Sequence, residues 1–290
     1  MVDLPPLATL YDSAPGDEVP LPIELATLYG SLRFPRSANT RPYVIGNFVT
    51  TLDGVVSLNA PGQAGGGEIS GFNSHDHMVM GILRAVVDAV IVGAGTLRAS
   101  PRHLWIAEHI FQPLAEVYRG WRSTLGKTEP PLNVIVSAHG ELDLGLPVFQ
   151  SGLVPVLIIT TTAGERRIRA RRLPAWIQIE AVEDMDPLST RSILRAVGHV
   201  RHCDVILTEG GPHLIGGFFA EKSLDELFLT LAPQIAGRDK SIERPGLIAG
   251  KIFAPEQALW GTLMSVKRGG SHLFLRYSFE SGVTPESQPF

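Results

Sequence analysis

Apolar residues in this chain fall into short uninterrupted runs, and several of the intervals between the runs repeat apolar residues at helical spacing. Short runs without alternation are typical of strands buried on both faces of a sheet. We expect strands over residues 42–50, 88–92, 134–137, 154–161, 176–182 and 204–209. The helical spacing predicts helices over residues 21–32, 75–87 (with Ser74 as its N-cap), 187–200 and 212–219.

The closing part of the chain differs, because strand-like runs follow one another there with little helix between them. Three such runs cover residues 225–233, 259–267 and 272–279. Strands connected in this way pair antiparallel at one side of a sheet, and Gly269-Gly270 suits a hairpin turn. We therefore expect one mixed α/β domain over residues 41–282. Residues 1–40 would be an extension that packs on this core, and residues 283–290 a tail.

Two of the expected strands end in glycine turns. Gly93-Ala94-Gly95-Thr96 follows one strand, and Gly210-Gly211 follows another and precedes Pro212, which suits the first turn of a helix. Glycine leaves no Cβ between the main chain and a ligand, so such turns can hold a phosphate on backbone N–H groups. Each turn by itself is most simply a tight loop. The two together indicate a nucleotide lying across the carboxyl ends of the sheet.

These turns do not form the standard dinucleotide-binding pattern. Position 98 is Arg where Gly-x-Gly-x-x-Gly requires its third glycine, and no acidic residue follows a second strand at the ribose-binding distance. A standard Rossmann domain is therefore disfavoured.

The composition of the chain argues against nucleic acid and membranes as binding partners. The chain has 290 residues and a net charge of −4, which gives no reason to expect nucleic-acid binding. Cys203 is the single cysteine, so no disulfide can form within the chain, and a cytoplasmic location is expected. No apolar run approaches the length of a membrane span, and the N-terminus lacks the pattern of a signal peptide, so no membrane partner is expected.

Two charged residues beside the expected elements are candidates for chemistry. Asp53-Gly54 follows the first strand, where it is either a plain turn or an acid placed for proton transfer. Arg84 lies near the end of the helix at 75–87, where it either complements the helix dipole or binds an anion. The glycine-rich loop at 59–71 is expected to be flexible and to close over a ligand.

Histidine-containing segments do not make a convincing metal site. His75 and His77 lie two apart, so a helix turns them to different sides, and His199-x-x-His202-Cys203 has no fourth ligand nearby. We expect no bound metal. The arginines at positions 166, 167, 169, 171 and 172 are most simply a solvated helix face, and the alternative is a site for the 2′-phosphate of a cofactor.

Five segments, taken together in order and spacing, are similar to a known family. They are Thr51–Gly54, Leu83–Ala85, Asp88–Arg98, Glu209–Leu214 and Asp225–Pro233. The sequence resembles the reductase domain of bacterial riboflavin biosynthesis, the RibD C-terminal domain, over most of residues 41–280. The resemblance implies a three-layer, dihydrofolate-reductase-like α/β fold whose central mixed, mostly parallel sheet has helices on both faces. It also implies a stand-alone homodimeric reductase that uses NADPH on a phosphorylated ribosylamino-pyrimidine.

The resemblance also assigns roles to residues. Asp53 would be the catalytic residue and would supply a proton if its neighbours raise its pKa, while NADPH supplies a hydride to C1 of the opened ribose. The substrate would contact Thr51, Arg84, Leu104 and Glu209. The cofactor would contact Gly93, Gly95, Thr96, Arg98, Ser137, Gly210, Gly211, Pro212, His213, Leu214 and Gly217.

Two departures from the family pattern keep other functions open. Ser100-Pro101 stands where the family has Asp-Pro, and Ala107 stands where an arginine for the substrate phosphate is expected. One alternative is a dihydrofolate-reductase-like reductase of another pterin or heterocycle. Another is an NADP-binding protein without this turnover. A flavin- or metal-dependent enzyme is a third, and the weak set of metal ligands argues against a metal.

Overall fold

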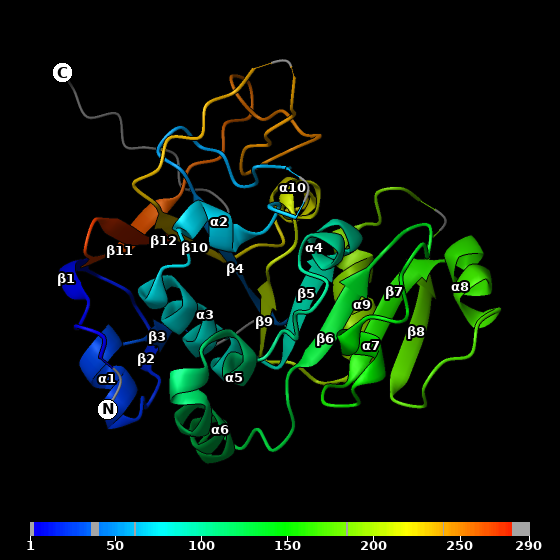
Figure 1. Ribbon diagram of the computed structural model, residues 1–290, viewed down its shortest axis with the longest axis horizontal. Helices are drawn as coiled ribbons and strands as arrows, with labels where there is room; N and C mark the ends of the chain where they lie inside the picture. The colour runs from blue at the N-terminus through cyan, green and yellow to red at the C-terminus, as the bar shows by residue number, and fades with distance from the viewer. Residues whose placement is uncertain (1–2, 36–40, 61, 184, 240, 280–290) are drawn as a thin grey trace.

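The computed structural model describes residues 3–35, 41–60, 62–183, 185–239 and 241–279, and the expected tail at 283–290 lies outside them. Its centre is a ten-stranded sheet in the order β1-β11-β12-β10-β4-β9-β5-β6-β7-β8 (Figure 1). The strands are β1 Ala8–Asp12, β4 Tyr43–Thr50, β5 Ala89–Gly93, β6 Leu132–Val136, β7 Val156–Thr161, β8 Ile177–Val182, β9 Val205–Thr208, β10 Glu226–Leu231, β11 Thr262–Gly269 and β12 His272–Ser278.

The sheet is mixed and mostly parallel, as the sequence predicts. Strands from β10 to β8 pair in parallel along the sheet order. The strands β12, β11 and β1 pair antiparallel at one side. Within β5, Val90 and Val92 belong to one apolar cluster, and Ala89 and Ile91 belong to the other. Burial on both faces explains why the strand runs are uninterrupted rather than alternating.

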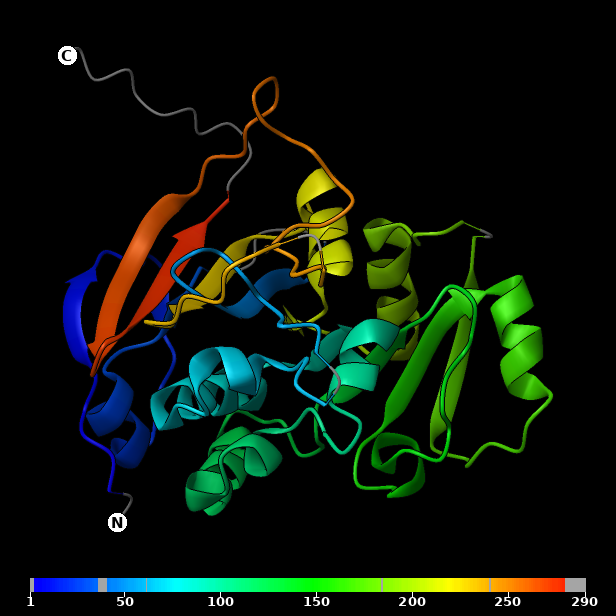
Figure 2. The same cartoon turned by 45° about the horizontal axis from the view of Figure 1, so that its top comes forward.

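Helices cover both faces of this sheet (Figures 1 and 2). Side chains of α3, α5 and α6 pack on one face, and those of α9 and α10 pack on the other. The helices are α1 Ile23–Tyr29, α2 Gly66–Ser70, α3 Ser74–Val86, α4 Ala94–Ala99, α5 Ala107–Ile110, α6 Ala115–Thr124, α7 Pro147–Gln150, α8 Thr162–Arg169, α9 Thr190–Val200 and α10 Pro212–Ala220. No helix among these is long and apolar enough to cross a membrane.

Three local expectations need correction. The N-cap of α3 is Asn73 rather than Ser74, since the Asn73 side-chain oxygen accepts hydrogen bonds from the amides of His75 and Asp76 at 3.0 and 3.1 Å. The glycine-rich loop contains a short helix, α2. The turn after β5 is not a loop, because α4 begins at Ala94, directly after the strand.

The described part of the N-terminal segment is built into the sheet and its core. Strand β1 pairs with β11, and a separate two-stranded sheet joins β2 (Asp17–Glu18) to β3 (Arg33–Phe34). Leu25 and Leu32 of this segment are buried in the cluster that α3 also joins. The ring of His75 contacts the carbonyl oxygen of Pro5 at 2.7 Å. His75 thus holds the N-terminal segment onto α3.

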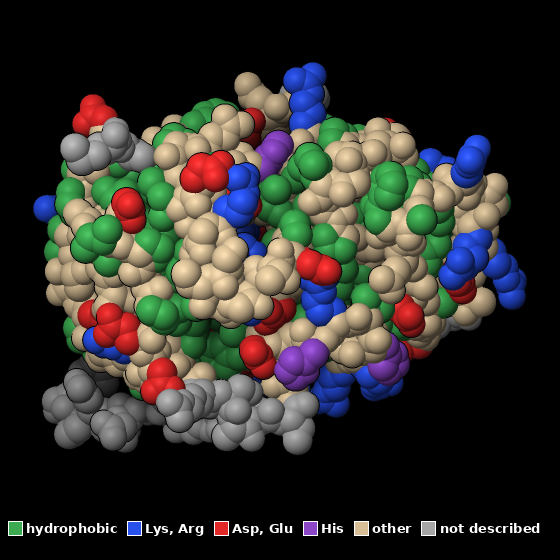
Figure 3. Space-filling model, turned by 90° about the horizontal axis from the view of Figure 1, so that it is seen from below, with side chains coloured by type: hydrophobic (Ala, Val, Ile, Leu, Met, Phe, Trp, Pro, Cys, Tyr) green, Lys and Arg blue, Asp and Glu red, His purple; other side chains and the backbone are tan. Residues whose placement is uncertain are grey.

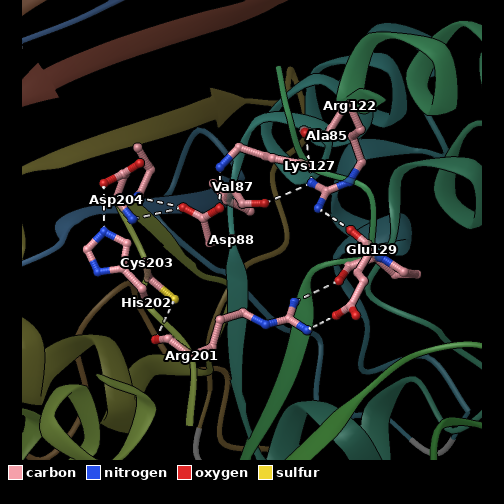
Figure 4. A network of polar contacts seen from close by, with 12 residues as sticks. Ala85, Val87, Asp88, Arg122, Lys127, Glu129, Arg201, His202, Cys203 and Asp204 are labelled. Carbon is pink, nitrogen blue, oxygen red and sulfur yellow. Dashed lines mark hydrogen bonds and ion pairs between the residues drawn. The ribbon is translucent and has the colours of Figure 1, made fainter. Parts of the chain in front are cut away.

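A network of charged groups closes the amino-terminal edge of the sheet (Figure 4). The buried guanidinium of Arg122 donates to the carbonyl oxygens of Ala85 and Val87, both at 2.8 Å, where α3 ends. Asp88 forms an ion pair with Lys127 and accepts a hydrogen bond from the amide of Asp204 at 2.9 Å. These bonds join the end of α3 to the starts of β5 and β9.

Candidate functional site

The carboxyl ends of β5 and β9 bring the two glycine turns together. A Cβ placed on Gly211 would lie 3.6 Å from the hydroxyl oxygen of Thr96. The side chain of Leu214 lies against both turns, because a Cβ on Gly210 would clash with it at 2.5 Å and one on Gly93 would lie 3.9 Å away. Gly210 is therefore required for packing. Gly93, Thr96, Gly211 and Leu214 all meet where the sequence predicts a nucleotide.

The residues around this meeting point suit a phosphate-bearing cofactor. α4 and α10 both begin here, and the first amides of a helix have no partner within it. Gly95 is exposed in the first turn of α4. The Ser137 hydroxyl at the end of β6 makes no hydrogen bond within the described part of the chain. The exposed guanidinium of Arg98 extends from the same helix as Gly95.

Three residues of α10 have structural roles that the sequence did not indicate. A Cβ on Gly217 would lie 3.2 Å from Thr190 of α9, so Gly217 packs against a helix and its expected contact with a cofactor is not supported. The Pro212 carbonyl accepts a hydrogen bond from the amide of Ala249 at 3.2 Å. A Cβ on Gly250 would lie 3.0 Å from the ring of His213. A later segment thus lies over the start of α10.

That segment crosses the carboxyl edge of the sheet. We call residues 234–239 and 241–250 the strap, and Figure 2 shows it above the ends of β4 and β9 together with the loop after β4. The carboxylate of Asp53 accepts from the amides of Ala236 and Gly237 at 3.1 and 2.8 Å. The Asp53 carbonyl also accepts from Arg238 at 2.7 Å. Asp53 therefore anchors the strap.

The expectation that Asp53 donates a proton depends on a raised pKa, and its neighbours act in the opposite direction. A hydrogen bond from the Thr51 hydroxyl, with the strap amides, lowers the pKa of Asp53 to about 2. Its carboxylate is ionised at neutral pH. Thr51 itself is 1% exposed, and its hydroxyl oxygen accepts from the amide of Val55 at 2.9 Å. Thr51 thus builds the turn, and its expected contact with substrate is not supported.

Arg84 and Glu209, both expected to bind substrate, are bound to each other. The Arg84 side chain is 1% exposed and that of Glu209 is 6% exposed. The guanidinium donates to the carboxylate through Nε at 3.1 Å and through Nη2 at 2.6 Å. The Asn47 amide also donates to Glu209, at 3.4 Å. The sequence placed both residues correctly at one site but did not indicate that they neutralise each other.

The third nitrogen of Arg84 contacts a histidine. Nη1 lies 2.7 Å from Nε2 of His103, whose ring is also close to those of Trp105 and His109. Burial and the Arg84 charge lower the pKa of His103 to about 2. His103 is therefore neutral, and its Nε2 is an acceptor, because a guanidinium can only donate.

Two further expectations concern the segment after α4. Leu104 is 5% exposed and belongs to the apolar core, so the structure gives it a packing role rather than contact with substrate. Ala107, at the position of the missing arginine, is also buried. Arg102 is exposed, and no bond to its guanidinium exists within the described residues. Arg98 and Arg102 are thus two exposed cations that no residue in the described part of the chain neutralises.

Three polar side chains at or near the site, Asn47, Asp76 and His103, were not predicted from the sequence as site residues. Asn47 is a polar residue within the otherwise apolar strand β4, and this interruption could have indicated a site residue. Asp76 is buried in the first turn of α3, where burial raises its pKa although the hydroxyls of Thr230 and Ser70 donate to it. His103 had no signal, because its partner Arg84 is contacted only in the folded chain.

Neither a metal-binding cluster nor the arginines of α8 adds to this site. No cluster of three or more His, Cys, Asp or Glu side chains that could hold a metal occurs among the described residues. The arginines of α8 lie at the far end of the molecule, where Figure 3 shows Lys and Arg side chains gathered. Arg167 pairs with Glu141 at 2.7 Å, and Arg169 pairs with Glu165 at 2.6 Å. This pattern is that of a solvated helix face.

Several solved structures share the fold. A pyrimidine reductase-like protein from Corynebacterium diphtheriae matches with a TM-score of 0.64 and 20% identity, over 88% of this chain and 98% of that chain. RibD from Acinetobacter baumannii matches with a TM-score of 0.60 and 19% identity, over 82% of this chain and 58% of that chain. This chain therefore spans little more than half of that protein. The riboflavin biosynthesis reductase Rib7 of Saccharomyces cerevisiae matches with a TM-score of 0.55 and 14% identity, over 84% and 93%.

Identities this low establish the common fold alone, which is the dihydrofolate-reductase-like fold expected from the sequence. A comparison with curated proteins gave no significant match. The family model described as the RibD C-terminal domain matches residues 42–259, which is most of the chain and contains every element from β4 to β10. The chain therefore belongs to the RibD C-terminal domain family.

Proposed function

We propose that this chain is an NADPH-dependent reductase of riboflavin biosynthesis, acting as a homodimer on a 5-amino-6-(5-phosphoribosylamino)uracil-type pyrimidine. The observation that carries the proposal is the meeting of Thr96 and Gly211 at the carboxyl ends of β5 and β9. Two glycine turns that each start a helix make a site for a dinucleotide. Membership of a family of reductases supports the reaction class.

Within this proposal the chain binds and orients the cofactor. The first-turn amides of α4 and the amides of Gly211 and His213 at the start of α10 hold phosphates, and Gly95 and Gly211 leave room for them. Arg98 takes the extra phosphate that distinguishes NADPH from NADH. The cofactor supplies a hydride, which the carbon C1 of the opened ribose accepts. Because Asp53 is ionised, solvent supplies the proton that balances the hydride.

Glu209 and the strap complete the substrate side. The Glu209 carboxylate, held by Arg84 and Asn47, is an acceptor for N–H or O–H groups of the substrate. The strap, anchored on Asp53, covers the edge and limits the access of water.

The test is steady-state turnover of the phosphorylated pyrimidine with NADPH and with NADH, with the reduced ribityl product identified by mass spectrometry. We expect turnover with NADPH at a lower KM than with NADH. Binding of NADPH without any reduced product would reject the substrate and leave the wider reductase class.

A second candidate is reduction of a pterin or another heterocycle that carries no phosphate. Its support is that the guanidinium of Arg84 is already bound by Glu209 and His103 and that Ala107 offers no cation. Turnover of dihydropterins with NADPH, in the absence of turnover of the pyrimidine, would favour this candidate.

A further inference from the structure

The donors of Arg84 are divided between two partners. A guanidinium has five N–H groups in a fixed plane. Nε and Nη2 point to Glu209, and Nη1 points to Nε2 of His103 and, at 3.5 Å, to the carbonyl oxygen of Ile106. With its side chain only 1% exposed, Arg84 has no donor turned toward solvent.

The contact between Arg84 and His103 fixes which ring nitrogen of His103 carries the proton. Since Arg84 has no acceptor, His103 must present the lone pair of Nε2 and carry its proton on Nδ1. A protonated ring would place a second cation and a second donor against Nη1. The charged or titratable groups around the ring are Arg84, His77 and His109, and each of them disfavours protonation of His103. The ring therefore stays an acceptor throughout the neutral range.

We propose that His103 is a positioning residue that keeps Arg84 turned toward Glu209 and withholds it from a substrate phosphate. A phosphate could reach Arg84 only by displacing His103 or Glu209, because the Arg84 side chain is 1% exposed and its nitrogens are bound to these two residues. The substrate phosphate is then bound by the exposed Arg102 instead. This inference rests on the proposed function for the identity of the substrate but not for the arrangement of Arg84.

The first experiment replaces the acceptor. His103→Leu removes the lone pair and keeps an apolar side chain beside Trp105, and His103→Gln restores an acceptor oxygen near the position of Nε2. His109→Leu is the matched control, since that ring neighbours His103 but makes no hydrogen bond to Arg84 within the described residues. We expect the preference in kcat/KM for the phosphorylated over the dephosphorylated pyrimidine to rise about tenfold in His103→Leu, because Nη1 is released to pair with phosphate.

The same experiment has two outcomes that decide the matter. His103→Gln and His109→Leu should keep the preference of the unaltered chain. Equal preferences in His103→Leu and the unaltered chain, or an equal rise in His103→Gln, would overturn the proposal.

A second experiment does not need turnover. Inorganic phosphate is titrated by calorimetry into the unaltered chain, His103→Leu and the double variant His103→Leu/Arg84→Met. We expect His103→Leu to bind inorganic phosphate about tenfold more tightly, and the double variant to lose this gain. The same affinity in all three would overturn the proposal even if the pyrimidine is a substrate. If the gain is found while no pyrimidine is turned over, the role of His103 stands and the proposed substrate fails.

A third measurement uses the unaltered chain and so does not depend on a variant that folds. Nitrogen NMR of the imidazole should show the proton on Nδ1 of His103, and the ring should remain neutral at mildly acidic pH. A proton on Nε2, or titration near the usual histidine pKa of about 6.5, would contradict the arrangement.

Discussion

The amino and carboxyl ends of the parallel strands use charged side chains in opposite ways. We refer to these two sides of the sheet as its amino-terminal edge and its carboxyl edge. At the amino-terminal edge, Arg122, Asp88 and Lys127 bind main-chain groups and each other, and they fasten helix and strand ends together (Figure 4). At the carboxyl ends of the strands, Gly95 and Gly211 leave space beside the starts of α4 and α10, and Arg98 and Arg102 are exposed. Polar groups that are satisfied within the chain stabilise the fold, whereas those left open can meet a ligand.

Arg84 belongs to both edges. Its carbonyl oxygen accepts a hydrogen bond from Arg122 at 3.3 Å, while its guanidinium binds Glu209 after β9. The comparison therefore predicts separable effects: changes at the amino edge should alter stability, and changes at the glycine turns should alter binding.

The largest effect is expected at the amino edge. Arg122→Leu leaves buried carbonyl oxygens of Ala85 and Val87 without a donor, which should lower the free energy of unfolding by about 3 kcal/mol or more. Urea denaturation measures it. Arg119→Leu is the control on the same helix, because Arg119 is exposed and should cost no more than about 0.5 kcal/mol. Equal losses in the two variants would show that the Arg122 bonds do not hold α3.

At the carboxyl edge, Gly95→Val should weaken NADPH binding about 100-fold, equivalent to about 2.8 kcal/mol, and leave the fold intact. A Cβ at Gly95 would meet no atom nearer than 4.0 Å, so any loss reflects the space that a cofactor needs. Calorimetry with NADPH tests this, with Gly120→Val as the control, since a Cβ there would meet nothing within 4 Å. Undiminished NADPH affinity in Gly95→Val would remove the turn from the cofactor site.

A smaller effect on cofactor affinity should distinguish Arg98 from the arginines of α8 as the site of the extra phosphate of NADPH. Arg98→Ala should lower the affinity for NADPH about tenfold and leave that for NADH unchanged, because only NADPH carries the extra phosphate. Arg166→Ala on α8 should change neither affinity. If Arg166→Ala reduces the preference for NADPH instead, the α8 arginines receive the phosphate and Arg98 does not.

The smallest effect concerns Asp53. Since its pKa is lowered, its bonds to the strap are fully formed above about pH 4 and are lost as the pH falls toward 2. Asp53→Asn should speed amide exchange at Ala236 and Gly237 and change kcat less than tenfold, below the 10²–10⁴-fold typical of a lost general acid. Asp143→Asn, in an exposed turn, is the control. A loss of turnover in the larger range would restore Asp53 as a proton donor.

Local pattern was enough to predict the strands from β4 to β12, the helices α3 and α10, and the positions of the two glycine segments, but not the strands β1, β2 and β3. Apolar runs and glycines report on their own neighbourhood, and strand–turn–helix units have few ways to assemble. The proximity of Thr96 and Gly211 follows from that assembly, because parallel strands bring their carboxyl ends to one edge.

Charge states could not be predicted in this way. The pKa of Asp53 is lowered most by the hydroxyl of Thr51, which is a local contact, and further by amides of the strap that lie 183 residues away for Ala236 and 184 for Gly237. The exposure of Arg84 depends on Glu209, 125 residues away, and on His103. Each residue type was recognised at its position, but whether its charge faces a ligand or a partner within the chain is decided by long-range contacts.

The N-terminal strand has a consequence for solubility. β1 is five residues long and exposed along its length, and its register with β11 shifts between Thr9 and Tyr11. An edge strand offers unpaired main-chain groups to other molecules, and short or bulged edges are poor templates for such pairing. Removing β1 would replace it by the eight-residue β11 as the outermost strand. By covering β11, the N-terminal segment is expected to reduce pairing between the sheets of different molecules and so to reduce aggregation.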